Sequence, residues 1–243
     1  MKIIINGACG RMGKEVEKLI EASDVHSVAA RADKFSDEEN CYKNIDAFMG
    51  EADVIIDFSN HLGTAELTEY AVKRNIPVVV STTGHSDEEL AMINAAAEKV
   101  AVFHSANMSL GVALLCELAV KTAAVMPEAD IEIVETHHNR KLDAPSGTAL
   151  MIANAIKTVR DKAFFKLGRA GNAKRAKDEI GIHAVRRGNI VGIHEVLVST
   201  DNQTITLKHE AHSRALFAEG AISAAEFICG KPAGLYNMNN IIE

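Results

Sequence analysis

Residues 2–22 read KIIINGACGRMGKEVEKLIEA, in which a β-branched run leads through a glycine-rich turn into a mixed charged and apolar stretch. The apolar residues after the turn recur with helical spacing. A strand that enters a helix through such a turn is typical of the first βα unit of an open sheet. The turn contains three evenly spaced glycines, Gly7, Gly10 and Gly13.

The first hundred residues continue to alternate between strand-like and helix-like segments. Strands are expected near residues 2–5, 25–31, 52–59, 76–84 and 100–107. One helix is expected over about 62–74, and another after Ser86, which has the spacing of a capping box with Glu89. This alternation predicts an α/β fold with a doubly wound parallel sheet.

The pattern changes after residue 108. Residues 109–126 form a long, almost wholly apolar helix that we expect to be buried between layers or subunits. Two more helices are expected, at 146–160 and 214–230, and four strands near 130–138, 179–186, 190–199 and 203–210. These elements predict an α+β region with a mixed or antiparallel sheet. Asp201-Asn202 is the expected turn between the last two strands. Residues 161–178, rich in Lys, Arg, Gly and Ala, are interpreted as a mobile loop.

The glycine turn has the features of a dinucleotide site, although its spacing is G-x-x-G-x-x-G rather than the commoner G-x-G-x-x-G. Small residues let the backbone approach a pyrophosphate, and the helix start supplies N–H donors. Asp33 follows Gly13 by 20 residues, where an acid that binds ribose belongs. Lys34 beside it suits a 2′-phosphate, so the pair predicts use of both NADH and NADPH. The alternatives are glycines needed only for turn geometry and two solvated surface charges.

Polar side chains follow three of the apolar strands, in DFSN (57–60), STTG (81–84) and SAN (105–107). The carboxyl ends of parallel strands line the ligand crevice of an open sheet. We therefore expect these segments to line the nicotinamide side of the crevice. Ordinary loop and helix-cap chemistry is the alternative interpretation.

Residues 135–150, ETHHNRKLDAPSGTAL, place many polar groups directly before a helix. His137 and His138 point to opposite faces of a strand, so we expect no metal site there. A histidine that titrates near neutrality can act as a proton donor, and Lys141 can supply positive charge. Ser146, Gly147 and Thr148 offer donors at a helix start. The segment indicates a cradle for a small anionic substrate, although a plain strand end is the simpler alternative.

The composition limits the possible partners. The net charge of -7 argues against a general nucleic-acid binder. No apolar run approaches the roughly 18 residues of a membrane span, and the first residues lack the pattern of a signal peptide. We therefore interpret the four scattered cysteines as free thiols in a reducing cytoplasm: Cys9, Cys41, Cys116 and Cys229.

Several segments together resemble the 4-hydroxy-tetrahydrodipicolinate reductase family, also called the dihydrodipicolinate reductases. ETHHNRKLDAPSGTA is similar to the family signature E-x-H-H-x-x-K-x-D-A-P-S-G-T-A. The likeness extends over most of the chain through six further segments: GACGRMG, DFS, TTG, SANMSLGV, VRRGNIVGIHEV and HSR. The resemblance implies a Rossmann-like cofactor domain at 1–108 plus 215–243. It also implies an inserted α+β domain at 109–214 that binds a dicarboxylate substrate and builds a homotetramer.

The resemblance also implies roles for individual residues in an NAD(P)H-dependent reduction of lysine and diaminopimelate biosynthesis. His137 matches the family's proton donor and Lys141 its partner in catalysis. The resemblance implies four substrate contacts: His138, Gly147, Thr148 and Arg214. We add Ser146 because of its place at the helix start. The implied cofactor contacts, besides Lys34, are Gly7, Ala8, Cys9, Gly10, Arg11, Met12, Asp33, Ser81, Thr82, Thr83, Ser105, Ala106, Asn107 and Met108.

Two other functions remain open at this point. A different two-domain NAD(P) dehydrogenase would keep the glycine turn but would not need the segment HHNRKLDAPSGT. A nucleotide-sensing regulator would lack the pair His137 and Lys141 or would carry a DNA-binding segment. Consumption of the reduced cofactor separates an enzyme from a sensor.

Overall fold

The computed structural model describes residues 1–242 and divides this part of the chain into two compact units. Unit 1 contains Met1–Ser109 together with the chain from Arg214 onward, and unit 2 contains Leu110–Ser213. The chain therefore leaves unit 1 once and returns to it through one helix. Ser109 and Arg214 both belong to unit 1, which places each junction one residue from the position expected from the sequence.

Unit 1 is built on a parallel sheet. Its strands in chain order are β1 (Lys2–Asn6), β2 (Ser27–Ala32), β3 (Val54–Asp57), β4 (Val78–Val80), β5 (Ala101–His104) and β11 (Gly234–Tyr236). Their order across the sheet is β11-β5-β4-β3-β1-β2, and every neighbouring pair is parallel. This arrangement confirms the doubly wound sheet. The strand order reverses between β1 and β3, where ligands bind in open α/β sheets.

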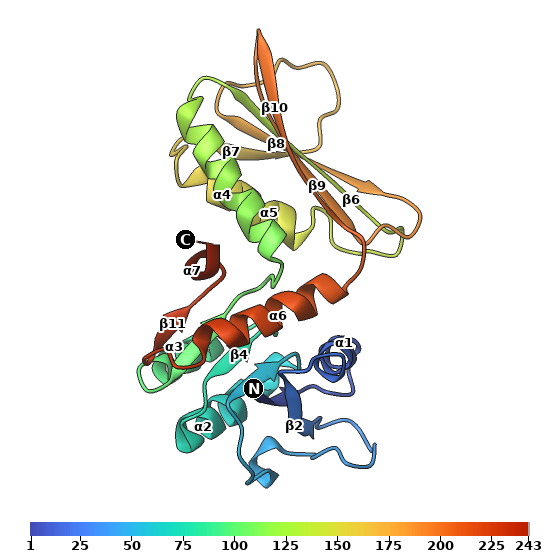
Figure 1. Ribbon diagram of the computed structural model, residues 1–243. Helices are drawn as coiled ribbons and strands as arrows, with labels where there is room; N and C mark the ends of the chain where they lie inside the picture. The colour runs from blue at the N-terminus through green and yellow to red at the C-terminus, as the bar shows by residue number, and fades with distance from the viewer. Residues whose placement is uncertain (243) are drawn as a thin grey trace. The chain divides into compact units, whose positions relative to one another are not determined.

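Helices cover both faces of this sheet, as Figure 1 shows. Helices α1 (Arg11–Glu21) and α6 (Ala215–Ile228) pack together on one face, and α2 (Thr64–Arg74) and α3 (Asp87–Ala97) pack together on the other. Short 3₁₀ turns lie at Ile45–Ala47 and His61–Gly63. Because both faces are covered, the central strands are continuous apolar runs, and β1 buries three consecutive isoleucines completely. The capping box of Ser86 and Glu89 at the start of α3 is confirmed.

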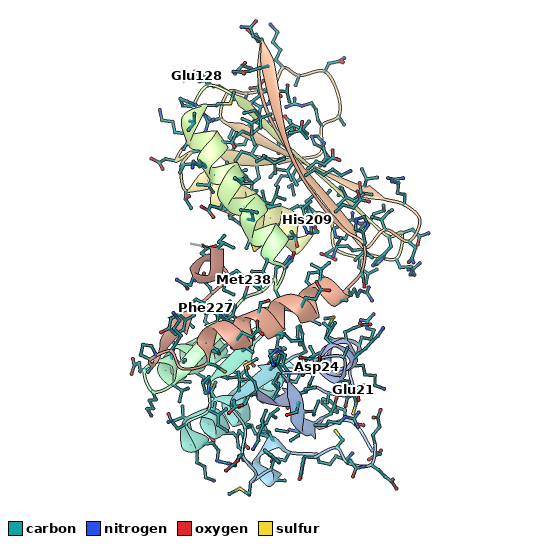
Figure 2. The ribbon with its side chains drawn as sticks, in the orientation of Figure 1. Glu21, Asp24, Glu128, His209, Phe227 and Met238 are labelled. Atoms are coloured by element: carbon teal, nitrogen blue, oxygen red, sulfur yellow. The ribbon has the colours of Figure 1, made fainter. Side chains whose placement is uncertain are left out.

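The edge of this sheet contains a strand that we did not predict. Strand β11 pairs with β5 through Leu235 and Val102, and a short helix, α7 (Asn239–Ile242), follows it. Phe227 of α6, which is labelled in Figure 2, packs edge-on against Phe103 of β5 and Tyr236 of β11, with ring centroids 6.4 and 5.8 Å apart. Three residues that begin with glycine give no periodicity, so only tertiary pairing identifies them as a strand.

Unit 2 contains a mixed sheet with both of its helices packed on one face (Figure 1). Its strands are β6 (Asp130–His137), β7 (Phe164–Leu167), β8 (Glu179–Arg186), β9 (Gly192–Thr200) and β10 (Gln203–Ala211), in the order β10-β9-β6-β8-β7. The pairs β6–β8 and β7–β8 are parallel, whereas β6–β9 and β9–β10 are antiparallel. Thr200 faces Gln203, which confirms the two-residue turn at Asp201-Asn202. The helices are α4 (Leu110–Val125) and α5 (Gly147–Lys157).

The interpretation of residues 161–178 as a loop was wrong for Phe164–Leu167. These residues form β7, an edge strand that is parallel to β8. Arg175 also attaches the segment to β6, because its guanidinium contacts Asp130 at 2.8 Å and Glu132 at 2.9 Å. An edge strand with largely exposed side chains lacks the apolar alternation that a sequence pattern detects.

The expectation that the apolar helix at 109–126 is buried holds for only part of its circumference. In unit 2, α4 buries a stripe of side chains that includes Leu115 and Ala119. Leu114 and Leu118 on its other side are 47% and 40% exposed in the single chain. Within residues 1–242, no helix combines the length and apolar character needed to cross a membrane.

Candidate active site

The glycine turn of unit 1 brings three backbone segments into close contact. Gly7 has a φ of +80°, and a Cβ there would lie 2.6 Å from the carbonyl oxygen of Phe58. A Cβ on Gly13 would lie 2.2 Å from the carbonyl oxygen of Gly7. Helix α1 begins after Gly10, and its first residues, RMGK, carry no acid. The helix start therefore keeps the positive potential and N–H groups that bind an anion.

A cleft of about 650 Å³ lies beside this turn. Segments that follow β1, β2 and β3 line it, so it occupies the point where the strand order reverses. Asp33 holds the wall in place, since its carboxylate accepts the amide N–H groups of Cys9 at 3.1 Å and Phe35 at 3.0 Å. Of the predicted cofactor residues, the structure brings five into the lining of this cleft: Gly7, Cys9, Gly10, Asp33 and Lys34.

A buried carboxylate, Asp57, joins the ends of three neighbouring strands. It is 2% exposed and accepts hydrogen bonds from Asn6 at 2.7 Å, from the Ser59 hydroxyl at 2.5 Å and from the Thr82 hydroxyl at 2.7 Å. Burial raises its pKa, and these donors oppose that rise. Asp57 therefore fixes two of the three polar strand ends that we expected to line the crevice, those after β3 and β4, although its own role was not predicted.

The other predicted cofactor residues lie near the turn or at the ends of the next two strands. Ser81 and Thr82 are buried after β4, whereas Thr83 is exposed. Ser105 and Asn107, after β5, bond to each other through the Ser105 hydroxyl, which donates to the Asn107 carbonyl at 2.7 Å. Of the rest, Ala8 and Met108 are buried, Met12 is half-buried, and Arg11 and Ala106 are exposed.

In unit 2, a fully buried glutamate organises the segment that we described as a cradle. Glu135 accepts two hydrogen bonds of 2.8 Å from the guanidinium of Arg186 and one of 3.0 Å from the amide of Ser146. Its Oε2 lies 2.6 Å from Nδ1 of His137. Burial alone would raise the pKa of Glu135, but the hydrogen bonds from His137, Arg186 and the Ser146 amide outweigh it and lower the pKa to about 2. Glu135 is therefore a carboxylate at neutral pH.

This carboxylate determines which nitrogen of His137 is available for chemistry. Because Glu135 accepts a hydrogen bond from Nδ1–H, Nε2 is the nitrogen that can exchange a proton with a substrate. Gly192 lies against that nitrogen, and a Cβ there would approach Nε2 to 3.1 Å. The absence of a side chain at Gly192 therefore leaves room beside Nε2. An oriented imidazole backed by a carboxylate can act as a general acid.

The remaining predicted substrate residues occupy different positions around the cradle. Lys141 is 2.8 Å from Asp143, and this pairing lowers the pKa of the Asp143 carboxyl. Gly147, the first residue of α5, is exposed, whereas Ser146 is buried as its N-cap. The Ser146 hydroxyl accepts the Ala149 amide at 3.2 Å and lies 3.1 Å from Nε2 of His194.

The last three predicted substrate residues differ in their places along the chain. His138 is half-buried directly after β6, and Thr148 is half-buried in the first turn of α5. Arg214 begins the second segment of unit 1, as the N-cap of α6.

Sequence reasoning missed three residues of this site: Glu135, Arg186 and His194. Glu135 stands two residues before His137, which on a strand is the same face, so this neighbour was detectable. Arg186 and His194 lie 51 and 48 residues from their partners, and no local pattern connects them. The ring centroids of His137 and His194 are 5.2 Å apart.

His194 should make the stability of unit 2 depend on pH. Burial, and then the charge of His137, lowers the pKa of His194 from 6.5 to about 4. The pKa of His194 is lower in the folded chain than in the unfolded chain. The contribution of neutral His194 to the free energy of unfolding is therefore complete above pH 6.5 and is lost as the pH falls to 4. We expect a loss of up to about 3 kcal/mol over this range. Urea unfolding followed by circular dichroism between pH 7 and 4 measures it.

Two variants isolate this effect. His194→Gln should show a smaller loss over the same range, while His183→Gln, the same change on strand β8 of this sheet, should behave like the unaltered chain. Equal slopes for all three proteins would contradict the assignment to His194.

Comparison with known proteins agrees with both units. The family model described as "Dihydrodipicolinate reductase, N-terminus" matches residues 1–108, and the model described as "Dihydrodipicolinate reductase, C-terminus" matches residues 111–242. The 4-hydroxy-tetrahydrodipicolinate reductase of Caldanaerobacter subterraneus subsp. tengcongensis is 46% identical, over 100% of this chain and 98% of its own length. The enzyme of the same name from Clostridium novyi is 44% identical with the same coverage.

A solved structure supports the same conclusion. The dipicolinate-bound dihydrodipicolinate reductase from Paenisporosarcina sp. TG-14 aligns with a TM-score of 0.83 and 26% identity, over 99% of each chain. The predicted resemblance is thereby confirmed over the whole length. The glycine turn, the buried glutamate-histidine pair and these matches together show that the chain belongs to the 4-hydroxy-tetrahydrodipicolinate reductase family of NAD(P)H-dependent oxidoreductases.

Proposed function

We propose that this chain reduces 4-hydroxy-tetrahydrodipicolinate to tetrahydrodipicolinate with NADH or NADPH, a step of lysine and diaminopimelate biosynthesis. The observation that carries this proposal is the oriented Glu135–His137 pair beside the start of α5. Unit 1 is the dinucleotide-binding domain in this proposal, and unit 2 is the substrate domain.

The cofactor fits the residues of unit 1. Gly7 and Gly13 leave no space for a side chain, which allows a pyrophosphate to approach the backbone at the start of α1. Asp33 and Lys34 face the same cleft and suit the ribose hydroxyls and a 2′-phosphate, respectively. When bound, the reduced nicotinamide supplies the hydride.

The substrate carries two carboxylates, and unit 2 offers donors suited to them. Gly147 and Thr148 are at the start of α5, where the positive end of the helix dipole favours an anion. Lys141 adds a positive charge, and a substrate carboxylate would share it with Asp143. His138 is the remaining proposed contact of unit 2, and Arg214, which the family resemblance assigns to the substrate, belongs to unit 1. Ser146 contributes indirectly, since its buried hydroxyl holds the first turn of α5 and its amide holds Glu135.

The chemical role of the chain is to deliver a proton. Loss of the 4-hydroxyl group of the substrate as water gives a conjugated ring. Addition of hydride to this ring leaves an electron-rich, enamine-like intermediate that must be protonated. His137 donates a proton from Nε2 to this intermediate. Glu135 stays ionised during the transfer, so its negative charge remains beside the imidazole. Lys141 and the start of α5 stabilise the negative charge that develops on the substrate.

The proposed activity predicts inhibition by a flat analogue. Pyridine-2,6-dicarboxylate has a planar ring with two carboxylates, so it should compete with freshly generated substrate in an assay that follows NADH absorbance. We expect competitive inhibition against substrate at millimolar concentrations or below. NADH binding without consumption would instead indicate a sensor, and inhibition only against NADH would place the cradle elsewhere.

The pair Asp33 and Lys34 predicts dual cofactor use. Titration of each cofactor should give affinities within about 100-fold, or roughly 2.7 kcal/mol. Lys34→Ala should weaken NADPH more than NADH because only NADPH carries the 2′-phosphate. Lys18→Ala, a matched change on the exposed side of α1, should affect neither. Equal losses for the two cofactors in Lys34→Ala would contradict the assignment of Lys34.

We also propose a homotetramer built through unit 2. The exposed leucines of α4, Leu114 and Leu118, support an oligomeric state, because a second copy could cover them.

A further inference from the structure

Two cysteines from distant parts of the sequence meet at the wall of the nucleotide cleft. Sγ of Cys9 lies 3.5 Å from Sγ of Cys41, and both side chains are partly buried. Cys9 belongs to the glycine turn and lines the cleft. The other two cysteines of the chain, Cys116 and Cys229, lie in α4 and directly after α6.

Backbone hydrogen bonds hold Cys9 and Cys41 at the same place, beside the end of β2. Residue 42 forms a bridge with Ala32, in which the Tyr42 amide donates to the Arg31 carbonyl at 2.8 Å and the Asp33 amide donates to the Tyr42 carbonyl at 2.8 Å. Cys41 is thereby fixed beside the end of β2. Cys9 is fixed to the same point, because its amide donates to the Asp33 carboxylate at 3.1 Å.

We propose that Cys9 and Cys41 form a reversible disulfide that weakens binding of the dinucleotide in this cleft. The inference rests on the proposed cofactor site only for its effect on binding, since the proximity of the two thiols does not depend on any function. It makes the pair a modification site through which the redox state of the surrounding thiol pool would control the enzyme.

The oxidant is a low-molecular-weight disulfide, RSSR. Burial raises the pKa of the Cys41 thiol to about 11, whereas Nη2 of Arg31 places positive charge 4.0 Å from Sγ of Cys9. Cys9 lines the cleft and is reached first, so it loses its proton and attacks RSSR, forming Cys9–S–SR and releasing one RS⁻. Cys41 then loses its proton and attacks Sγ of Cys9, which releases the second RS⁻. In total, two protein thiols lose two protons and two electrons, and RSSR becomes two RSH.

Closure changes the wall of the nucleotide cleft, because Cys9 lines it. A disulfide bond is about 2.05 Å long, so the sulfurs must approach by roughly 1.5 Å from their present separation. The turn has little freedom to move, because Gly7 and Gly13 already contact neighbouring backbone atoms at distances that exclude a Cβ. The movement must therefore come from the Cys9 side chain or from the segment before Cys41, which contains Ser36 and Glu38 and also lines the cleft.

The test uses the full-length chain in a glutathione buffer that contains oxidised glutathione and a large excess of reduced glutathione. In this buffer a lone thiol returns to its free form, whereas a pair whose reduction potential lies below that of the buffer stays closed. Intact mass and peptide mapping should show loss of two hydrogens and a link between Cys9 and Cys41. The dissociation constant for NADH, from fluorescence titration, should rise at least about tenfold and should recover after dithiothreitol.

Two variants serve as controls. Cys41→Ser should show no mass loss and should keep its NADH affinity in the same buffer, while Cys116→Ser should behave like the unaltered chain. Absence of the Cys9–Cys41 link would overturn the proposal, and so would a fully linked protein that binds NADH as tightly as the reduced one. If the reduced chain does not bind NADH or NADPH at all, the proposed cofactor site fails, and the mass measurement still decides whether the thiol pair closes.

Discussion

Replacing His137 with alanine is expected to lower kcat by about 10²–10⁴-fold, the span usual for loss of a general acid. The imidazole is held by a 2.6 Å hydrogen bond to Glu135, so its Nε2 is the group positioned to deliver a proton. NADH affinity should hardly change, because the glycine turn belongs to unit 1 and His137 to unit 2. Steady-state kinetics, NADH titration and thermal unfolding on the same protein samples measure the three quantities.

A second variant separates catalysis from folding. His137→Asn retains an amide donor near the position of Nδ1 and should preserve the bond to Glu135, yet it cannot act as an acid. We expect it to be folded and as inactive as His137→Ala. The matched control is His183→Asn on β8, since His183 also contacts a glutamate, Glu132, at 2.8 Å. Near-normal turnover in folded His137→Asn would overturn the proposed mechanism.

Replacement of Lys141 provides a further test of the proposed catalytic mechanism. Lys141→Ala should also lower kcat, with a rise in KM if the lysine holds a substrate carboxylate. Because His137 and Lys141 would act on one intermediate, the double variant should lose less than the product of the two single losses. Strictly multiplicative losses would indicate that the two residues act independently.

Arg186→Ala is expected to produce the largest loss of stability, about 3 kcal/mol. Glu135 is fully buried, and removal of its two guanidinium bonds leaves the carboxylate with only the His137 and Ser146 donors. The pKa of Glu135 should then rise from its value of about 2, so acid unfolding should begin at a higher pH than in the unaltered chain. Denaturant unfolding at pH 7 and at pH 4 measures both effects.

The adjacent arginine is the natural control. Arg187 is exposed, and its amide donates to the His137 carbonyl at 2.9 Å, a bond that Arg187→Ala retains. This variant should change stability by less than about 0.5 kcal/mol, as is usual at a surface position. Equal losses for the two arginine variants would show that the buried bonds to Glu135 contribute nothing specific.

The sequence alone was sufficient for features that depend on short-range chemistry. The glycine turn, the capping box at Ser86 and the turn at Asp201-Asn202 each follow from the geometry of a few consecutive residues. The parallel sheet of unit 1 was predictable because strands buried on both faces are continuous apolar runs. Strands β7 and β11 were not, since each depends on the neighbour with which it pairs.

What only the tertiary structure decided is the environment of His137. The parallel register of β6 and β8 places Arg186 opposite His137, and Glu135 lies two residues earlier on the same face of β6. Arg186 therefore reaches Glu135, whereas Arg187, next to it in the sequence, is exposed. A shift of one residue would exchange the two arginines, because successive side chains of a strand point to opposite faces. Local sequence specifies that a histidine is present, but the pairing of strands far apart in the chain determines which charges surround it.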